Sequence, residues 1–466
     1  GSEMCIRDRP GMVPDSMARQ EDQTASHIHY HTVRLSRIHT LLLMNYEEKL
    51  SWLFRQLPMF SRIGAAAYKP GLERSIALAE HFGNPQDKWK SIHVAGTNGK
   101  GSVSHLLACA LQSNGYKVGL YTSPHLVDFR ERMRINGRMI PKDKVEQFID
   151  EWREAAERYP DKPSFFELTM MMAFKWFADE KVDFAVIEVG MGGRLDSTNI
   201  IHPLMSVITN ISWDHAQFLG DTLGKIAGEK AGIMKSGVPV VVGEAEGDVE
   251  EVFRRHAAET GAQLIEAYNL QDAEANARLE ELCPLHGDYQ HKNLNTFRVA
   301  ARTLEKIIPS LHMDKMEQSV RDIVKATGLR GRWEILSDSP LTICDTGHNE
   351  AGIRSNMAQL KRLMSRRPGA RLHMVIGFVA DKDLDHILPL FPTNAVYYLS
   401  QAQIPRALNY LDLKAKADAY GWNSTAYSTV SGAVQAARSA AAPGDIIYIG
   451  GSTFIVADHL ANLEKA

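Results

Sequence analysis

The stretch 91–102, SIHVAGTNGKGS, constrains the fold of this chain more than any other. The β-rich run Ser91–Ala95 leads into a glycine-rich loop around Lys100, and an apolar helical pattern follows at once. A strand, such a loop and a helix N-terminus form a cradle for phosphate, because backbone N–H groups and the helix dipole both attract anions. The stretch therefore predicts a nucleoside triphosphate site in which Lys100 supplies a mobile cation.

The match to the common phosphate-loop pattern G-x-x-x-x-G-K-[ST] is imperfect. Val94 stands where the first glycine belongs, and Gly101 separates Lys100 from Ser102. An ordinary glycine-rich turn is the alternative interpretation. The phosphate site remains our first interpretation because strand, loop, lysine, hydroxyl and helix occur in the expected order.

The composition indicates a soluble globular protein with more than one domain. The chain has 466 residues, of which 44% are hydrophobic and 23% charged, and this length exceeds what one core usually holds. A net charge of -3 gives no reason to expect nucleic acid or an anionic membrane as a partner. We also expect no membrane span and no signal peptide. Scattered cysteines without paired spacing indicate reduced thiols in the cytoplasm; they are Cys5, Cys109, Cys283 and Cys344.

Residues 1–43 differ from the rest of the chain because they lack sustained periodicity and mix His, Arg, Ser and Thr. The opening Gly-Ser resembles an expression scar, and Met44 stands directly before an amphipathic helix pattern. We expect a disordered or non-native leader. The alternating His27, His29 and His31 are better explained by a polar tail than by a metal site.

Alternation of strands and helices predicts an α/β fold with two domains, 44–328 and 329–466, joined by a linker near 329–332. The first would be a phosphate-loop ATPase-type domain with a mostly parallel sheet, and the second a smaller Rossmann-like α/β domain. Expected strands of the first domain cover residues 91–95, 117–121, 183–189, 205–211, 238–242 and 263–265. Those of the second cover 334–336, 341–344, 371–377, 396–399 and 445–449.

Two strands deliver chemically active side chains beside the phosphate loop. The buried strand 183–189 carries Glu188 to a glycine-rich turn, and the strand 205–211 leads to His215. Ligands of open α/β sheets bind beyond the carboxyl ends of the strands, so both residues should face one crevice. Glu188 is a candidate magnesium ligand, because Mg²⁺ prefers oxygen ligands. The alternatives are a carboxylate satisfied by backbone N–H groups and a structural histidine.

Two polar segments leave their interpretation open. The loop 122–140 offers the hydroxyls of Thr122 and Ser123, and its alternating arginines fit an exposed hairpin as well as a functional loop; these arginines are Arg130, Arg132 and Arg134. The segment GDYQHKNLNTF places several amides near a helix entrance, where they could be functional or simply cap the helix; they are Gln290, Asn293 and Asn295. Ser164 and Glu167 have capping-box spacing before an apolar helix.

Taken together, several blocks resemble the folylpolyglutamate synthase and dihydrofolate synthase family of the Mur ligase superfamily. They are GTNGKGS (96–102), TSPHL (122–126), EVGMGGRLDSTN (188–199), DH…LG (214–220), GEKAGIMK (228–235), GDYQHKN (287–293), GRWE (331–334) and DTGHN (345–349). The resemblance runs from about Met44 to the C-terminus. The inserted Gly101 is the family's own form of the loop, so the earlier mismatch becomes support.

The resemblance implies an ATP-dependent amide ligase. ATP would phosphorylate a carboxylate of dihydropteroate or a folate, and the amine of L-glutamate would displace phosphate from the acyl phosphate. It also implies two Mg²⁺ ions, a lysine, Lys230, that is carbamylated in several superfamily members, and a monomer. A cell-wall Mur ligase and a regulatory phosphate-loop NTPase are the alternatives. No residue decides between dihydropteroate and folates.

The resemblance also assigns roles to individual residues. Lys100, Glu188, His215, Lys230 and His348 would be catalytic. Gly96, Thr97, Asn98, Gly99, Lys100, Gly101, Ser102, Asn293, Arg332 and Asp345 would hold ATP. Ser123, Glu188, His215 and Lys230 would coordinate magnesium, and Thr122, Phe129 and Ser452 would contact the other substrates, with Phe129 stacking on the pterin.

Overall fold

The computed structural model describes residues 44–57, 70–159 and 161–465. The expected leader, with its histidines and Cys5, lies outside the described residues. The chain forms two compact units that divide after Leu53. Of the first unit the structure describes residues 44–53, which contain the start of helix α2 (Tyr46–Gln56). Both sheets belong to the second unit.

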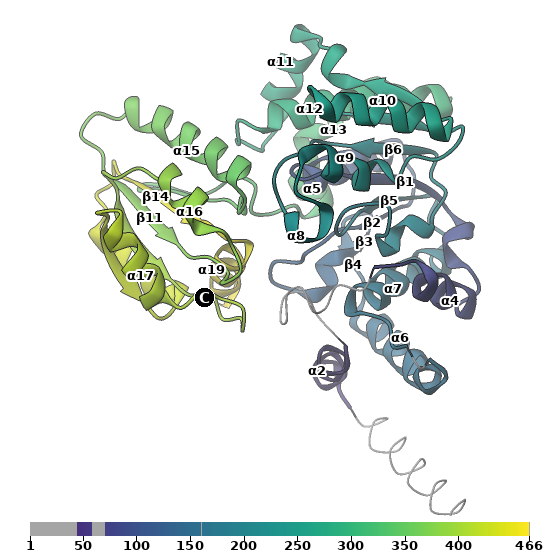
Figure 1. The fold of residues 1–466 in the computed structure, drawn as a ribbon, viewed down its shortest axis with the longest axis horizontal. Helices are drawn as coiled ribbons and strands as arrows, with labels where there is room; N and C mark the ends of the chain where they lie inside the picture. Colours follow the sequence, from purple (N-terminus) through teal and green to yellow (C-terminus); the bar gives the residue numbers. More distant parts are fainter. Residues whose placement is uncertain (1–43, 58–69, 160, 466) are drawn as a thin grey trace, which may run out of the picture. The chain divides into compact units, whose positions relative to one another are not determined.

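The first sheet has eight strands in the order β4-β3-β2-β5-β1-β6-β7-β8 (Figure 1). Its strands are β1 (Lys90–Ala95), β2 (Val118–Tyr121), β3 (Met133–Ile135), β4 (Arg138–Met139), β5 (Phe184–Glu188), β6 (Met205–Ile208), β7 (Pro239–Val242) and β8 (Gln263–Glu266). The strands from β2 to β8 in this order pair in parallel, whereas β3 pairs antiparallel with both of its neighbours, β2 and β4. The chain crosses from one side of β1 to the other after β5, which makes the end of β1 a topological switch point.

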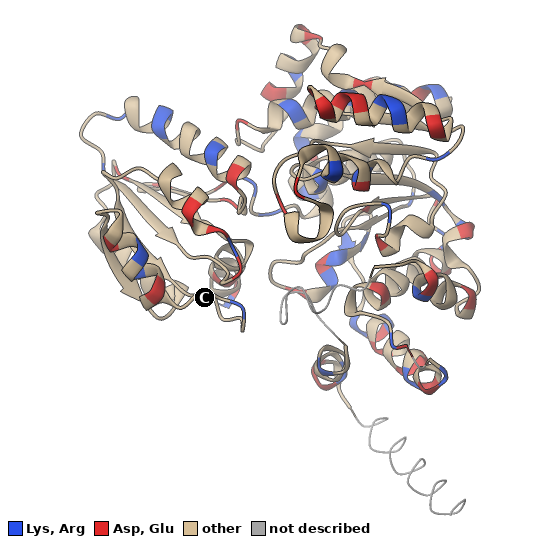
Figure 2. Cartoon of the chain, viewed as in Figure 1, with Lys and Arg blue, Asp and Glu red and all other residues tan. Residues whose placement is uncertain are grey.

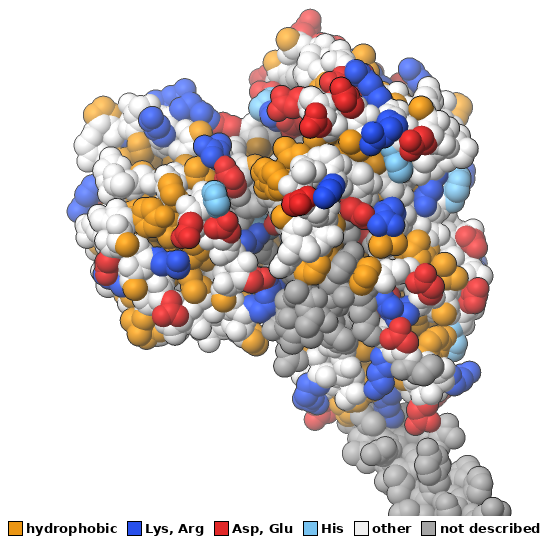
Figure 3. All heavy atoms as spheres, viewed as in Figure 1, with side chains coloured by type: hydrophobic (Ala, Val, Ile, Leu, Met, Phe, Trp, Pro, Cys, Tyr) orange, Lys and Arg blue, Asp and Glu red, His pale blue; other side chains and the backbone are white. Residues whose placement is uncertain are grey.

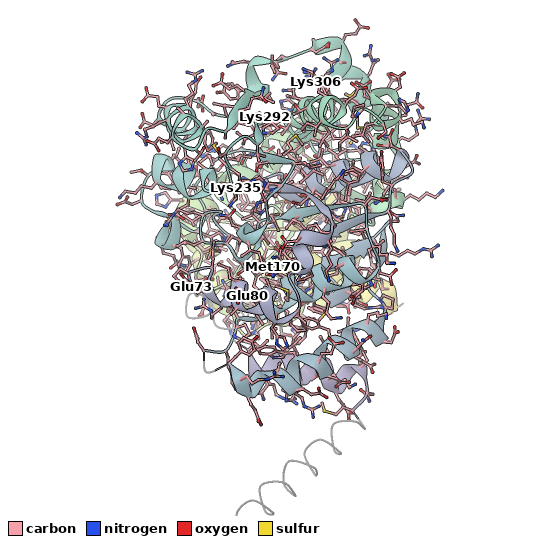
Figure 4. All side chains as sticks on the ribbon, turned by 90° about the vertical axis from the view of Figure 1, so that its right-hand side faces the viewer. Glu73, Glu80, Met170, Lys235, Lys292 and Lys306 are labelled. Atoms are coloured by element: carbon pink, nitrogen blue, oxygen red, sulfur yellow. The ribbon has the colours of Figure 1, made fainter. Side chains whose placement is uncertain are left out.

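Helices cover both faces of this sheet. They are α4 (Glu73–His81), α5 (Lys100–Ser113), α6 (Lys142–Ala155), α7 (Phe165–Asp179), α8 (Ala216–Leu219), α9 (Leu223–Ala231), α10 (Asp248–Thr260), α11 (Ala273–Leu282), α12 (Gln290–Ile307), α13 (Met313–Ser319) and α14 (Ile323–Thr327). One apolar core joins α5, α12 and α13 to the sheet, and another joins α9 and α10 to it. Figure 4 labels Met170, which is fully buried in α7, and Lys292 and Lys306, which stand near the two ends of α12. Glu73 and Glu80, on α4, are exposed.

The predicted capping box is present at the start of α7. The Ser164 hydroxyl accepts from the Glu167 N–H at 3.2 Å, and the Glu167 carboxylate accepts from the Ser164 N–H at 2.6 Å. The expected arginine hairpin is only partly exposed. Arg130 pairs with Asp128 at 2.7 Å, whereas Arg132 is buried and stacks over the ring of Phe165.

The second sheet has six strands in the order β13-β12-β11-β14-β10-β9, and all its pairs except β9–β10 are parallel. Its strands are β9 (Glu334–Asp338), β10 (Leu341–Cys344), β11 (Leu372–Ile376), β12 (Val396–Ser400), β13 (Asn423–Tyr427) and β14 (Ile446–Gly450). Its helices are α15 (Glu350–Ser365), α16 (Leu384–Ile387), α17 (Tyr410–Ala419), α18 (Val430–Ala440) and α19 (Thr453–Lys465). The mostly parallel second sheet was expected from the sequence, but strand β13 was not.

The outer helices carry both signs of charge. Figure 2 shows acidic and basic residues mixed along α10 and α17, and Figure 3 shows apolar side chains scattered among charged ones on the visible face. Within the described residues, no helix has the length and apolar character needed to cross a membrane. Cys109, Cys283 and Cys344 are buried and form no disulfide.

Candidate functional site

A cavity of about 1340 Å³ lies at the carboxyl ends of the strands of the first sheet. Typical pockets for one small ligand measure roughly 300–1,000 Å³, so this cavity has room for more than one ligand. Its lining residues lie on two sides of the phosphate loop, which we call its arms. One arm follows β2 and β5, the other follows β6, β7 and the start of α12, and residues of the loops and helices around the second sheet complete the wall. Every site residue expected from the sequence lines this cavity except Phe129.

The phosphate loop follows β1, at the topological switch point of the sheet, and lies between the two arms of the cavity. Gly96 and Gly99 have φ values of 143° and 83°, which disfavour side chains, and a Cβ on Gly99 would lie 2.2 Å from Asn293 Oδ1. Helix α5 begins at Lys100, whose Nζ donates to the carbonyls of Gly96 at 2.9 Å and Thr97 at 3.1 Å. The ammonium group therefore lies over the loop, where phosphate oxygens could replace these carbonyls.

Amides from α12 hold the loop from the side. Gln290 Nε2 donates to Ser102 Oγ at 3.3 Å, and Asn293 Nδ2 donates to Gln290 Oε1 at 2.8 Å. The residue that caps α12, Tyr289, makes no side-chain cap. Of the two interpretations of these amides, the structure thus favours contacts with the phosphate loop over capping. Asn295 instead bonds the Ala267 carbonyl at 2.8 Å.

Glu188 supplies a buried carboxylate beside the loop. It is 4% exposed, its Oε2 accepts from the Ser123 N–H at 2.9 Å, and its Oε1 takes no hydrogen bond from any described residue. Burial raises the pKa of Glu188, and the nearby charge of Lys100 opposes this shift. A carboxylate with an unused oxygen in a cavity fits a divalent cation, which prefers hard oxygen ligands.

His215 faces the same cavity from the turn before α8, at a φ of 52°. Burial lowers its pKa to about 4, so its imidazole is neutral near pH 7 and available as a ligand.

The neighbouring Asp214 was not expected as a site residue from the sequence. It accepts from Lys382 Nζ at 2.9 Å and lies 3.5 Å from His348 Nε2. Although burial opposes the shift, the hydrogen bond from His348 and nearby positive charges hold the pKa of Asp214 well below its usual range.

Lys230 is a buried amine that has no hydrogen-bond partner in the part of the chain that the structure describes. It is 4% exposed, and no described residue forms a hydrogen bond or ion pair with it. Burial and the charge of Lys100 lower the pKa of Lys230 to about 7. About half of such amines are neutral at pH 7, and a neutral amine is a nucleophile. Among the described residues no cluster of three or more His, Cys, Asp or Glu could hold a metal without other ligands.

Residues after the linker close the cavity from the second sheet. Arg332 donates to Thr346 Oγ1, and its Nη2 lies 3.2 Å from where a Cβ on Gly101 would stand. Asp345 is 2% exposed and accepts four hydrogen bonds of 2.6–2.7 Å, so its carboxylate positions the surrounding backbone. The Ser452 hydroxyl, 4% exposed, accepts from the Phe454 N–H at 3.2 Å.

The aromatic residue that lines the arm over β2 and β5 is not the expected one. Phe129 is 3% exposed and packs against Phe54 and Phe165, with 5.8 Å between ring centroids in both pairs. Its ring therefore has no face toward the cavity. Phe166, at the start of α7, lines the cavity instead, close to Gly190 and near Thr122. The signal was present in the sequence, because Phe166 follows the capping Ser164 that fixes this helix start.

Comparisons with known proteins identify relatives over most of the chain. The family described as Mur ligase middle domain matches residues 94–305, and the family described as Mur ligase, glutamate ligase domain, matches 331–453. The dihydrofolate synthase/folylpolyglutamate synthase of Bacillus subtilis (strain 168) is 32% identical over 437 residues, covering 89% of this chain and 98% of that protein.

Solved structures agree with these sequence matches. Escherichia coli FolC in complex with DHPP and ADP has a TM-score of 0.74 and 28% identity, and the match covers 90% of this chain and 98% of that one. The bifunctional folylpolyglutamate synthase/dihydrofolate synthase of Yersinia pestis complexed with AMPPNP and Mn ion also has a TM-score of 0.74 and 28% identity, covering 89% and 98%.

Proposed function

Because the chain belongs to the folylpolyglutamate synthase and dihydrofolate synthase family of Mur ligases, we propose that it adds L-glutamate to dihydropteroate or folates at the expense of ATP. The observation that carries the proposal is one cavity in which the phosphate loop, Glu188, His215 and Lys230 meet. A regulatory NTPase needs a site for the nucleotide alone, whereas this cavity has a second arm that Phe166 lines.

In the proposed reaction, an acyl carboxylate oxygen attacks the γ-phosphorus of ATP, ADP leaves, and an acyl phosphate forms. The amine of glutamate then attacks the acyl carbon, phosphate leaves, and the amine loses a proton as the amide forms. Lys100 and Arg332 supply positive charge where the phosphoryl group moves, and charge placed in advance is the main means of catalysis for such transfers. Asn293 and the loop glycines hold the nucleotide, while Thr122 and Phe166 contact the acyl substrate.

The same proposal includes metal ions. Ser123, Glu188 and His215 would hold a Mg²⁺ ion, which would offset the negative charge of the phosphates. The Yersinia pestis relative forms a complex with AMPPNP and Mn ion. We further propose a second ion beside Lys230, whose neutral amine would take up carbon dioxide and become an anionic carbamate. Its pKa of about 7 supports this assignment, because uptake requires the neutral amine.

Further features belong to the proposal as well. Residues 44–328 would act as the nucleotide domain, and 329–466 as the domain that brings His348 and Ser452 to glutamate. Asp345 would position this edge beside the nucleotide. We propose a monomer that works in the cytoplasm on small molecules, without nucleic acid or a membrane as partner.

Phosphate release tests the proposed function. We expect release from ATP to require Mg²⁺, L-glutamate and an acyl substrate together, with dihydropteroate and tetrahydrofolate assayed in parallel to identify that substrate. Mass spectrometry of the product should show one added glutamate. Release without glutamate would favour an NTPase, and release with a UDP-linked peptide precursor instead of either pteridine would favour a cell-wall ligase.

A further inference from the structure

Two side chains of helix α15, Gln359 and Arg362, contact the segment before α12, and of these Gln359 does not line the cavity. Gln359 accepts from the Asp288 N–H through Oε1 at 2.8 Å and donates through Nε2 to the His286 carbonyl at 2.7 Å. The side-chain amide of Gln359 thus both donates to and accepts from the backbone of the segment 286–288, as the peptide group of a paired strand would. Gln359 is 8% exposed, and Arg362 on the next turn pairs with the Asp288 carboxylate. We call these contacts of Gln359 and Arg362 with residues 286–288 the clasp.

The clasp leads directly to the phosphate loop. Tyr289 follows Asp288 and donates to Asp345 Oδ2 at 2.6 Å, and α12 begins at the next residue. Gln290 then contacts Ser102, and Asn293 Oδ1 fills the space in front of Gly99. Any shift of the segment 286–288 would therefore move the amides that support the loop.

Among the described residues, none that lines the opposite arm forms a hydrogen bond with α15. Its wall near Phe166 is built by α7 and by the turn after β5, and the contacts of Phe166 and Gly190 lie within the first sheet and its helices. A change at Gln359 should therefore affect nucleotide binding and leave acyl-substrate binding unchanged.

We infer that Gln359 is a positioning residue that fixes the start of α12 between the two sheets and thereby sets nucleotide affinity. The inference rests on the proposed function for the identity of the nucleotide. Gln359 touches neither substrate in this arrangement, because it does not line the cavity. Its effect passes through two backbone hydrogen bonds, each of which a side chain without an amide would lose.

The test replaces Gln359 by methionine, which keeps the length of the side chain but cannot donate. We expect the Kd for ADP, measured by titration calorimetry, and the KM for ATP to rise about tenfold. At saturating ATP, kcat should change less than twofold, and so should the KM of the acyl substrate. Gln147→Met is the matched control, because Gln147 is an exposed helical glutamine whose amide donates only to Glu151 on its own helix.

Equal ADP affinity in Gln359→Met and the wild-type chain would overturn the inference. An equal loss of affinity for the nucleotide and for the acyl substrate would overturn it as well. If the methionine variant does not fold, Gln359→Asn replaces it, since its shorter amide cannot reach both backbone groups and should weaken ADP binding as well. A wild-type chain that binds ADP but releases no glutamate-dependent phosphate would refute the proposed function alone. A wild-type chain that binds no ADP would refute both.

Discussion

At the scale of single residues, the site is unbalanced in charge. Burial and the nearby charge of Lys100 lower the pKa of Lys230, and Glu188, at the end of β5, is a buried acid beside the phosphate loop. Because a buried unpaired charge is costly, Lys230 gives up its proton readily. Conversion of this amine into a carbamate would replace a costly cation by an anion suited to a metal ion.

Lys230→Ala should lower glutamate-dependent phosphate release at least about a hundredfold, since the proposed second metal ion would lose its ligand. In the wild-type chain equilibrated with ¹³C-labelled bicarbonate, a carbamate signal should appear by NMR. Its intensity should rise from pH 6 to pH 8, because the pKa of Lys230 is about 7 and only the neutral amine reacts. Unchanged activity of Lys230→Ala would contradict the assignment.

Lys235→Ala is the control for this prediction. The Lys235 amine, only partly buried, donates to the Asn199 carbonyl at 3.3 Å on the outer side of the same segment. The Lys235→Ala variant should retain activity within about twofold and keep the carbamate signal. A signal that persists in Lys230→Ala would mean that the carbamate forms on another residue.

The sequence correctly predicted which residues line the cavity where a strand end or a glycine loop determines their position. Glu188 and His215 follow apolar strands, so the parallel sheet brings them together. Lys382 could not be found in this way, because it reaches Asp214 across 168 positions of the chain. Phe129 and Phe166 are equally aromatic in the sequence, and only tertiary packing decides which ring lines the cavity.

At the scale of elements, strand β13 was missed because its sequence NSTAY is polar and lies at the edge of its sheet. An edge strand pairs on one side only and needs no apolar alternation. Helix α7 was found because its capping box is a local signal. The same cap fixes the position of Phe165 and Phe166, so the start of this helix links stability to the acyl arm.

Ser164→Ala should therefore lower the free energy of unfolding by about 1 kcal/mol and also raise the KM of the acyl substrate. Asn409→Ala is the matched control. Asn409 caps α17 by accepting from the Leu411 N–H at 2.8 Å and does not line the cavity. In denaturant unfolding, Asn409→Ala should lower the free energy of unfolding by a similar amount, and it should leave the KM of the acyl substrate unchanged. An unchanged KM in Ser164→Ala would show that the cap does not position the ring.

At the scale of the whole molecule, the first sheet is built around histidines that cannot take up a proton. His93 on β1 is fully buried, with Nε2 2.8 Å from Thr198 Oγ1, and His105 on α5 lies 2.7 Å from Thr327 Oγ1. Burial, with smaller contributions from nearby positive charges, lowers the pKa of each to about 3. Folding therefore depends on these two rings remaining neutral.

This arrangement predicts that acid weakens the fold well above the range in which carboxylates titrate. Below about pH 6.5 the unfolded chain binds protons that the folded chain excludes, so the free energy of unfolding falls as the pH drops from 6.5 toward 3. At pH 5.5 each histidine lowers the free energy of unfolding by about 1 kcal/mol. The exposed His386, whose pKa is raised by its hydrogen bond to Asp383, opposes the trend, but solvent screens its interaction.

The urea concentration at the midpoint of unfolding should decrease from pH 7.5 to 6.5 to 5.5. In His93→Gln, whose side chain can still bond Thr198, this midpoint should decrease less steeply with pH. Equal midpoints from pH 7.5 to 5.5 would contradict the exclusion of protons from these rings.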